Sequence, residues 1–161
     1  MDKTHLMQFA EAMAHNDPDS AFRPVSEQIV LHSPIFDDAF VGKAEVRRVI
    51  QAVKSIVDAT ARTGVAKGDD RVVMFNTITL GGVGAETAEV IQVDADGLID
   101  RITVMWRPLG AVLEGQSRLA ALIGRDTDKL AAGSRAVRPP DEHPAPVSVP
   151  EGVAAAHSAR R

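Results

Sequence analysis

Residues 85–107 read AETAEVIQVDADGLIDRITVMWR, and this stretch decides the fold. Two apolar runs, Ala85–Val93 and Leu98–Arg107, flank the turn sequence DADG. Strand-forming runs joined by a short segment of Asp and Gly are typical of a β-hairpin. We therefore expect two antiparallel strands here. A third, Arg71–Leu80, precedes them and is joined to them by the turn sequence GGVG.

Apolar and polar side chains alternate along Leu98–Arg107. Successive side chains of a strand point to opposite faces of the sheet, so the alternation predicts one buried face and one outer face. The predicted buried face carries Leu98, Ile102, Val104 and Trp106, and the other face carries Arg101, Thr103 and Arg107 together with Ile99 and Met105.

Glu89 stands among apolar residues in the middle of the second strand. If Val93 pairs with Leu98 across the turn, Glu89 falls opposite Ile102 and faces the same buried side. A carboxylate there must be hydrogen-bonded, be held neutral or turn out to water. With a raised pKa, Glu89 could donate a hydrogen bond as a neutral acid or act as a general base near neutral pH. The alternative is a carboxylate paired with an Arg on the outer face or at a dimer contact.

Asn76 is the second polar residue that this pairing directs inward. If Leu80 pairs with Ala85 across the glycine-rich turn, Asn76 falls directly opposite Glu89. A one-residue change in either turn would move both side chains to the outer face. We therefore expect an Asn and a Glu side by side in an otherwise apolar interior.

His32 lies in a short apolar run, Gln28–Ser33, which Pro34 ends. Imidazole titrates near neutral pH, so His32 could act as an acid or base together with Glu89. Its alternative role is to bond the backbone at the end of a strand. Ser33 is better explained as a turn or capping residue, because no nucleophile motif surrounds it.

Helical periodicity marks the remaining elements. Residues 4–15 predict an amphipathic helix, and residues 17–20 predict the start of a short second one, with a capping Asp followed by Pro. Gly42 opens the strongest helical pattern. Residues 108–123 predict a final helix, with an inner side made of Leu109, Val112, Leu113, Leu119 and Leu122.

The predicted fold class is α+β, with helices gathered on one side of an antiparallel sheet. A curved sheet with a long helix lying across it would enclose a conical cavity. We assign residues 1–125 to this one domain. Residues 131–161 are rich in Pro and Ala and have no apolar periodicity, so we expect a disordered tail there.

Composition narrows the possible functions. The chain has 161 residues, 45% hydrophobic content and a net charge of −4, with no cluster of basic and aromatic residues, so we expect no nucleic-acid partner. Cysteine is absent, which excludes disulfides and thiolate metal sites and fits a cytoplasmic protein. The five His residues are scattered and predict no metal site. No phosphate-binding or dinucleotide motif predicts a cofactor, and no apolar run is long enough to cross a membrane.

Two segments resemble a known family. They are IVLHSPIFDDAFVGKAEVRRVI at residues 29–50 and VDADGLIDRITVMWRPL at residues 93–109. Together with the order of elements they are similar to the SnoaL-like branch of the nuclear transport factor 2-like (NTF2-like) superfamily, over about residues 5–123. The resemblance implies a cone with a deep apolar pocket and a homodimer formed through the outer face of the sheet. Members include ketosteroid isomerases, polyketide cyclases, epoxide hydrolases and non-catalytic binding proteins, so the fold alone does not choose a function.

Compared with the ketosteroid isomerases, Glu89 stands at the position of the protonated oxyanion-hole acid and Trp106 at that of a pocket Trp. Ser33 stands where the general base is expected and Phe9 where the oxyanion-hole Tyr is expected, which argues against the same isomerisation. The Arg/Asp/Asp set of epoxide hydrolases has no match. The resemblance implies a ligand-binding wall made of Trp106, Val104, Ile102, Asn76 and Phe9.

Three functions remain open from the sequence. The first is binding of a small hydrophobic molecule, steroid-like or polyketide-like, without obligatory catalysis. The second is an isomerase or cyclase in which Glu89 and His32 transfer protons. The third is a non-enzymatic dimerisation or interaction module whose cone is filled with its own core.

Overall fold

The computed structural model describes residues 4–15 and 17–124. Four helices and six strands follow one another, and the predicted tail at residues 131–161 lies outside the described residues. No helix in the described part is long and apolar enough to span a bilayer. In chain order the elements are α1 (Thr4–Ala14), α2 (Pro18–Ala21), β1 (Val25–His32), β2 (Phe40–Val41), α3 (Lys43–Ile56), β3 (Ala59–Lys67), β4 (Arg71–Leu80), β5 (Val83–Val93), β6 (Ile99–Arg107) and α4 (Leu109–Ile123).

The predicted α+β class is confirmed, but the sheet is mixed rather than antiparallel. Its six strands lie in the order β2-β1-β6-β5-β4-β3. The pair β1–β6 is parallel, and every other pair is antiparallel. Because β1 comes early in the chain and lies beside the last strand, the sheet joins the two ends of the domain. The backbone N–H of Ile99 donates to the carbonyl oxygen of Pro24 at 2.9 Å, where β1 and β6 begin.

Strand β3 does not follow from the sequence pattern. Its residues, ATARTGVAK, are exposed except for the half-buried Gly64. The strand lies at the free edge of the sheet, beyond β4. An edge strand with both faces open to water needs no alternation of apolar and polar residues. The run of consecutive antiparallel strands after α3 therefore has four members, β3 to β6, instead of the predicted three.

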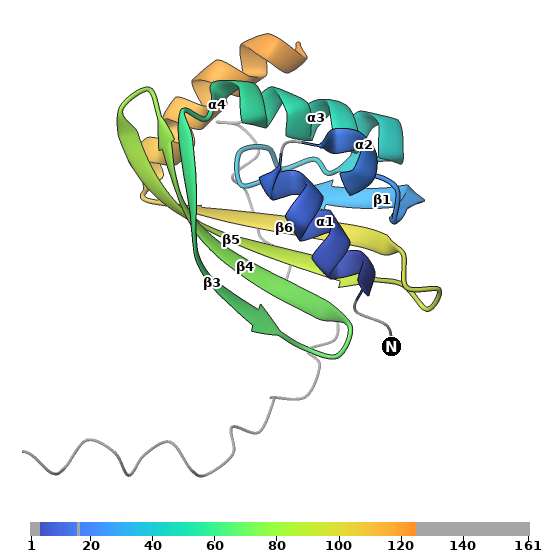
Figure 1. Ribbon diagram of the computed structural model, residues 1–161. Coiled ribbons are helices and arrows are strands. Elements are labelled where there is room, and N and C mark those ends of the chain that lie inside the picture. Colours follow the sequence, from blue (N-terminus) through green and yellow to red (C-terminus); the bar gives the residue numbers. More distant parts are fainter. Residues whose placement is uncertain (1–3, 16, 125–161) are drawn as a thin grey trace, which may run out of the picture.

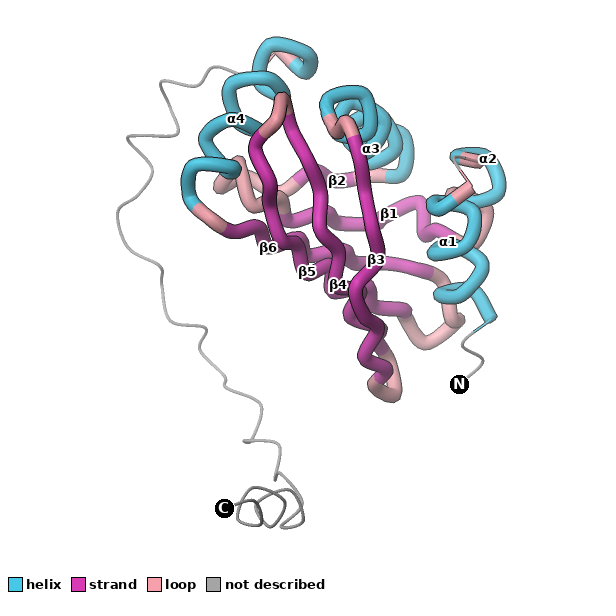
Figure 2. The backbone as a smooth tube through the Cα atoms, turned by 60° about the vertical axis from the view of Figure 1, so that its left-hand side comes forward, coloured by secondary structure: helices cyan, strands magenta, loops and turns pink. Residues whose placement is uncertain are grey.

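The helices cover one side of the curved sheet (Figures 1 and 2). Helix α3 packs its buried Val46 and Val49 against the core, opposite the sheet. Gly42 is the N-cap of this helix, at the position predicted from the sequence, with φ of 94°. A φ in this range is accessible to glycine at little cost.

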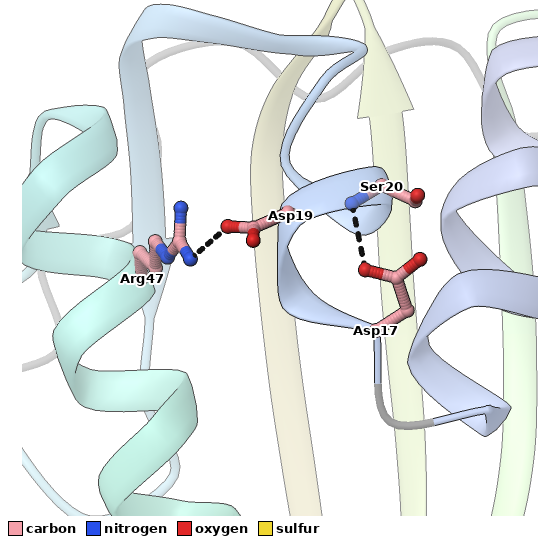
Figure 3. Close-up of polar contacts among 4 residues, drawn as sticks. All are labelled: Asp17, Asp19, Ser20 and Arg47. Carbon is pink, nitrogen blue, oxygen red and sulfur yellow. Dashed lines mark hydrogen bonds and ion pairs between the residues drawn. The ribbon is translucent and has the colours of Figure 1, made fainter.

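The predicted second helix forms as α2, a single turn beside α3 (Figure 3). Asp17 caps it by accepting a hydrogen bond from the backbone N–H of Ser20 at 3.1 Å. Hydrogen bonding to Ser20, first with its side chain and then with its backbone N–H, lowers the pKa of Asp17 from 3.8. Asp19 forms an ion pair with Arg47, which ties α2 to α3.

Three of the five residues that helix α4 buries are small, and the predicted inner face is wrong in three of its five positions. Leu109, Leu113 and Leu122 are 71%, 54% and 55% exposed, whereas Leu119 is buried as predicted. At Gly115 the helix lies so close to the Trp106 ring of β6 that a larger side chain would collide with it. The residues that α4 buries are Ala111, Gly115, Leu119, Ala120 and Ile123.

The predicted outward position of Ile99 is also wrong. A register shift lies between Gln92 and Val93, where Val93 pairs with Ile99 and Gln92 with Arg101. The extra residue in β6 turns Ile99 inward, where it is fully buried. Leu98, predicted on the buried face, precedes the strand and is half-buried.

Candidate functional site

Strand register directs Glu89 to the helix-covered face of the sheet. Glu89 lies opposite Val104 on β6 and opposite Met74 on β4, rather than opposite the predicted Ile102 and Asn76. At each of the two turns, the observed strand pairing differs from the predicted pairing by two residues. Because side chains alternate with a period of two, an even shift leaves every residue on its predicted face.

One transverse row of side chains crosses this face. Arg62 on β3 pairs with Asn76 on β4, Asn76 pairs with Thr87 on β5, and Thr87 pairs with Trp106 on β6. Directly opposed residues point to the same face, and all four line the same cavity. Glu89 lies in the next row, between Met74 and Val104. Asn76, Thr87 and Glu89 are therefore neighbours on the otherwise apolar inner face of the sheet.

A cavity of about 610 Å³ opens between the sheet and the helices. Helices α1 and α3 form its opposite wall, with Phe9 and Val53 among their contributions. The segment after β1 adds Ser33, Pro34 and Ile35. The exposed residues on its rim mark the mouth, beside the edge strand: Asp58, Ala59, Thr60 and Arg62.

The residues proposed from the sequence as a pocket wall all line this cavity. Trp106, Val104 and Ile102 come from β6, Asn76 from β4 and Phe9 from α1. Phe9 also packs edge-on against Phe22, with ring centroids 6.3 Å apart. The five positions are thus brought together, while their roles in binding stay predictions.

Asn76 connects the polar groups of the cavity. Its Nδ2 atom donates to Oε1 of Glu89 at 3.2 Å and to Oγ1 of Thr87 at 3.3 Å. Asn76 and Thr87 are only 6% and 5% exposed. Desolvation in this apolar setting raises the pKa of Glu89 above 4.5, and the positive charge of Arg62 acts in the opposite direction. The neutral form of Glu89 is therefore favoured relative to that of an exposed glutamate, and this form can donate a hydrogen bond to an acceptor.

His32 does not share the cavity with Glu89, so the predicted pair is wrong. Its side chain is exposed and is not part of the cavity wall, although both of its sequence neighbours, Leu31 and Ser33, are. The alternation along β1 turns Leu31 inward and His32 outward. Ser33 accepts a hydrogen bond from the backbone N–H of Ile35 at 3.1 Å, in agreement with its expected turn role.

Two functional candidates were missed from the sequence, Arg62 and Thr87. Arg62 belongs to β3, which has no apolar pattern to reveal it. Thr87 stands two residues before Glu89 on the same strand, so the period of two could have placed it beside Glu89. Within residues 4–15 and 17–124, no group of three His, Asp or Glu side chains is arranged to hold a metal ion.

Trp106 reaches helix α4 through a gap at Gly115. A Cβ atom built on Gly115 would lie 2.5 Å from Cζ3 of Trp106 and 3.4 Å from Cδ1 of Ile35. Contacts near 2.5 Å are shorter than carbon atoms tolerate. The glycine thus allows the indole ring to lie between the cavity and the helix.

The outer face of the sheet carries a separate apolar patch, formed by Phe75, Ala88 and Met105 in one transverse row. Phe75 and Met105 are 42% and 49% exposed. The homodimer expected through this face stays a prediction. Sedimentation of the wild type and of Met105→Glu would test it, since a dimer held by this patch should dissociate in the variant.

Comparison with known proteins rests on structure, because no family model and no curated protein sequence matches this chain. An uncharacterised protein with a cystatin-like fold from Silicibacter pomeroyi superimposes with a TM-score of 0.71 at 17% identity, covering 80% of this chain and 91% of that one. An NTF2-like protein of unknown function from Burkholderia xenovorans gives 0.56 at 12% identity, covering 65% and 80%. The fold of this chain is NTF2-like.

A steroid delta-isomerase from Pseudomonas aeruginosa shares this NTF2-like fold. Its TM-score is 0.69 at 21% identity, with coverage of 79% of this chain and 92% of that chain. The resemblance to NTF2-like proteins that the two sequence segments indicated is thus confirmed for the fold. At these identities the NTF2-like fold alone is shared, and the site must indicate the function.

Proposed function

We propose that this protein binds a small apolar molecule, steroid-like or polyketide-like, in the cavity beneath α1 and α3. The observation that carries the proposal is a cavity of about 610 Å³ with an apolar wall and one connected polar group, Asn76 with Glu89 and Thr87. Ligand sites for small molecules usually have about 300–1,000 Å³, mostly apolar walls and a few placed polar groups.

The polar group would orient the ligand. A neutral Glu89 can donate a hydrogen bond to a carbonyl or hydroxyl oxygen, and Asn76 holds the Glu89 side chain in place from the neighbouring strand. Trp106 offers a flat ring beside it, against which a fused-ring skeleton can stack. A ligand without an oxygen atom would leave the Glu89 proton unpaired, at a cost in affinity.

Proton transfer by Glu89 is a second candidate function. The raised pKa of Glu89 supports it, because a carboxyl group that titrates closer to neutral pH can both give and take a proton. The shared fold of the steroid delta-isomerase agrees with such chemistry. His32 has no part in it, so Glu89 would act alone. A turnover rate that loses its pH dependence in Glu89→Gln would support this candidate, and equal rates in both proteins at every pH would exclude it.

The binding proposal is tested by filling the cavity from β6. Val104→Phe adds a ring on the cavity side, and Thr103→Phe adds the same ring on the opposite face of the same strand. We expect Val104→Phe to weaken binding of the best steroid, polyketide or fatty-acid ligand by at least about tenfold, since lost cavity space costs contacts over a whole ring. Thr103→Phe should bind as the wild type does.

Isothermal titration calorimetry measures both affinities, and circular dichroism confirms that each variant is folded. Equal affinities in the wild type and in a folded Val104→Phe would contradict binding in this cavity. Loss of affinity in Thr103→Phe alone would place the ligand on the outer face instead.

A further inference from the structure

Two cationic side chains line the cavity, Arg62 at its mouth and Lys54 four residues before the rim residue Asp58. Arg62 belongs to the row that continues through Asn76, so it stands on the cavity side of β3. Its guanidinium makes no hydrogen bond or ion pair with the described residues. Such a group, exposed beside an apolar cavity, is available to a ligand.

Lys54 approaches the mouth from the last turn of α3. Its Nζ atom donates to the carbonyl oxygen of Met13 at 3.0 Å, so the ammonium group is held in place at the end of α1. Lys54 is half-buried, and desolvation lowers its pKa from 10.5. An anion placed beside this ammonium group would replace part of the hydration that the lysine lacks.

Two acidic side chains also line the cavity, Asp58 at the mouth and Glu89 on β5. Asp58 directs its Oδ2 atom to the backbone N–H of Gly81 at 2.6 Å, in the turn between β4 and β5. Desolvation raises the pKa of Glu89, so its neutral form is favoured relative to that of an exposed glutamate. Arg62 and Lys54 thus outnumber the one carboxylate at the mouth, Asp58, which leaves a net positive charge there in a protein whose formal net charge is −4.

We propose that the ligand is an apolar carboxylic acid whose anionic group is held at the mouth by Arg62 and Lys54, while a carbonyl or hydroxyl oxygen at its other end meets Asn76 and Glu89. This inference rests on the proposed ligand-binding function and narrows its ligand class. Arg62 on β3 lies one strand spacing from Asn76 on β4 and two from the strand of Glu89, about 5 and 10 Å, and these backbone spacings set the approximate separation of the ligand's two oxygen-bearing ends.

Charge at the two ends is coupled. The positive charge of Arg62 lowers the pKa of Glu89, against the effect of desolvation. A bound carboxylate offsets that positive charge, so Glu89 holds its proton more firmly when the acid is bound. The neutral donor at the bottom of the cavity and the anion at the mouth therefore favour each other.

The test compares acids with their methyl esters, which differ only in the charge at one end. Suitable probes are lithocholic acid and methyl lithocholate, dodecanoic acid and methyl dodecanoate, and an anthraquinone carboxylic acid and its methyl ester. Affinities are measured from Trp106 fluorescence in the wild type, in Arg62→Gln, in Lys54→Gln and in the control Arg101→Gln. Arg101 is exposed on the outer face of β6, so the control removes the same charge away from the cavity.

We expect the acid to bind the wild type about five- to tenfold more tightly than its ester in at least one pair, as one charge-assisted hydrogen bond at a partly solvated site predicts. This preference should disappear in Arg62→Gln and persist in Arg101→Gln. It should also decrease as salt is raised, because ions screen exposed charges.

An ester that binds as tightly as its acid would overturn the inference and leave the proposed function intact. A preference for the acid that survives in Arg62→Gln and in Lys54→Gln would also overturn it. Equal weakening of acid and ester by Arg62→Gln would overturn it too, because Arg62 would then make no contact that depends on the ligand's charge. Absence of binding by all three pairs would count against the proposed function as well.

Discussion

Replacing Gly115 with Ala should lower the free energy of unfolding by about 1–3 kcal/mol, the usual cost of overpacking a closely packed interior. The added methyl group would lie 2.5 Å from the Trp106 ring, which would have to move away from α4. Replacing a helical glycine with alanine normally stabilises the helix by about 1 kcal/mol. We expect the close contact with Trp106 to outweigh this gain, so that the protein is destabilised.

Gly110→Ala is the matched control in the same helix. A Cβ atom at Gly110 has no neighbour within 4 Å, so only the helix propensity changes and we expect stabilisation by up to about 1 kcal/mol. Urea unfolding followed by circular dichroism measures both changes, and the emission spectrum of Trp106 reports movement of the ring. Two substitutions of equal sign and size would contradict the close contact between Gly115 and Trp106.

We expect the wild type to lose stability as pH rises, and the variant Glu89→Gln to lack this loss. Burial raises the pKa of Glu89 in the folded state, so its neutral form contributes full stability below the ordinary pKa of 4.5. That stability is lost as pH rises through the raised folded-state pKa, by about 1.4 kcal/mol for each unit of difference between the two states. A Gln at position 89 keeps an oxygen for Asn76 and carries no charge at any pH.

The measurement is the urea-unfolding free energy of both proteins at a series of pH values from about 4 upward. We expect the variant to gain stability relative to the wild type as pH rises, and to show little difference in acid. Glu86→Gln serves as control, because Glu86 is on the same strand, exposed, and paired with Arg107 on the outer face. A constant difference between wild type and Glu89→Gln across the series would contradict a buried carboxyl group with a raised pKa.

Much of the cavity could be predicted because its residues obey a period of two. The turns between the last three strands are short, and both misplaced registers differ from the real ones by two residues. Glu89, Asn76 and Trp106 therefore reach the predicted face even though their predicted neighbours were wrong. The helical pattern after Gly42 placed α3 in the same way, since its apolar residues follow one face.

The remaining errors have local physical causes. Strand β3 has no buried face, so Arg62 gave no signal in the sequence. The register shift at the start of β6 turns Ile99 inward, and a bulge has no clear mark in a short apolar strand. Helix α4 buries Ala111 and Gly115 instead of Leu109 and Leu113, and the Trp106 ring occupies the space beside Gly115.

The central claim is that the cavity holds a small apolar molecule, and titration of the protein while following Trp106 fluorescence tests it most directly. The chain has one Trp and no Tyr, and this Trp lines the cavity, so the signal reports on the site itself. The account predicts a saturable change with at least one class among steroids, aromatic polyketides and fatty acids. An unchanged spectrum across all three classes, in a protein that circular dichroism shows to be folded, would contradict it.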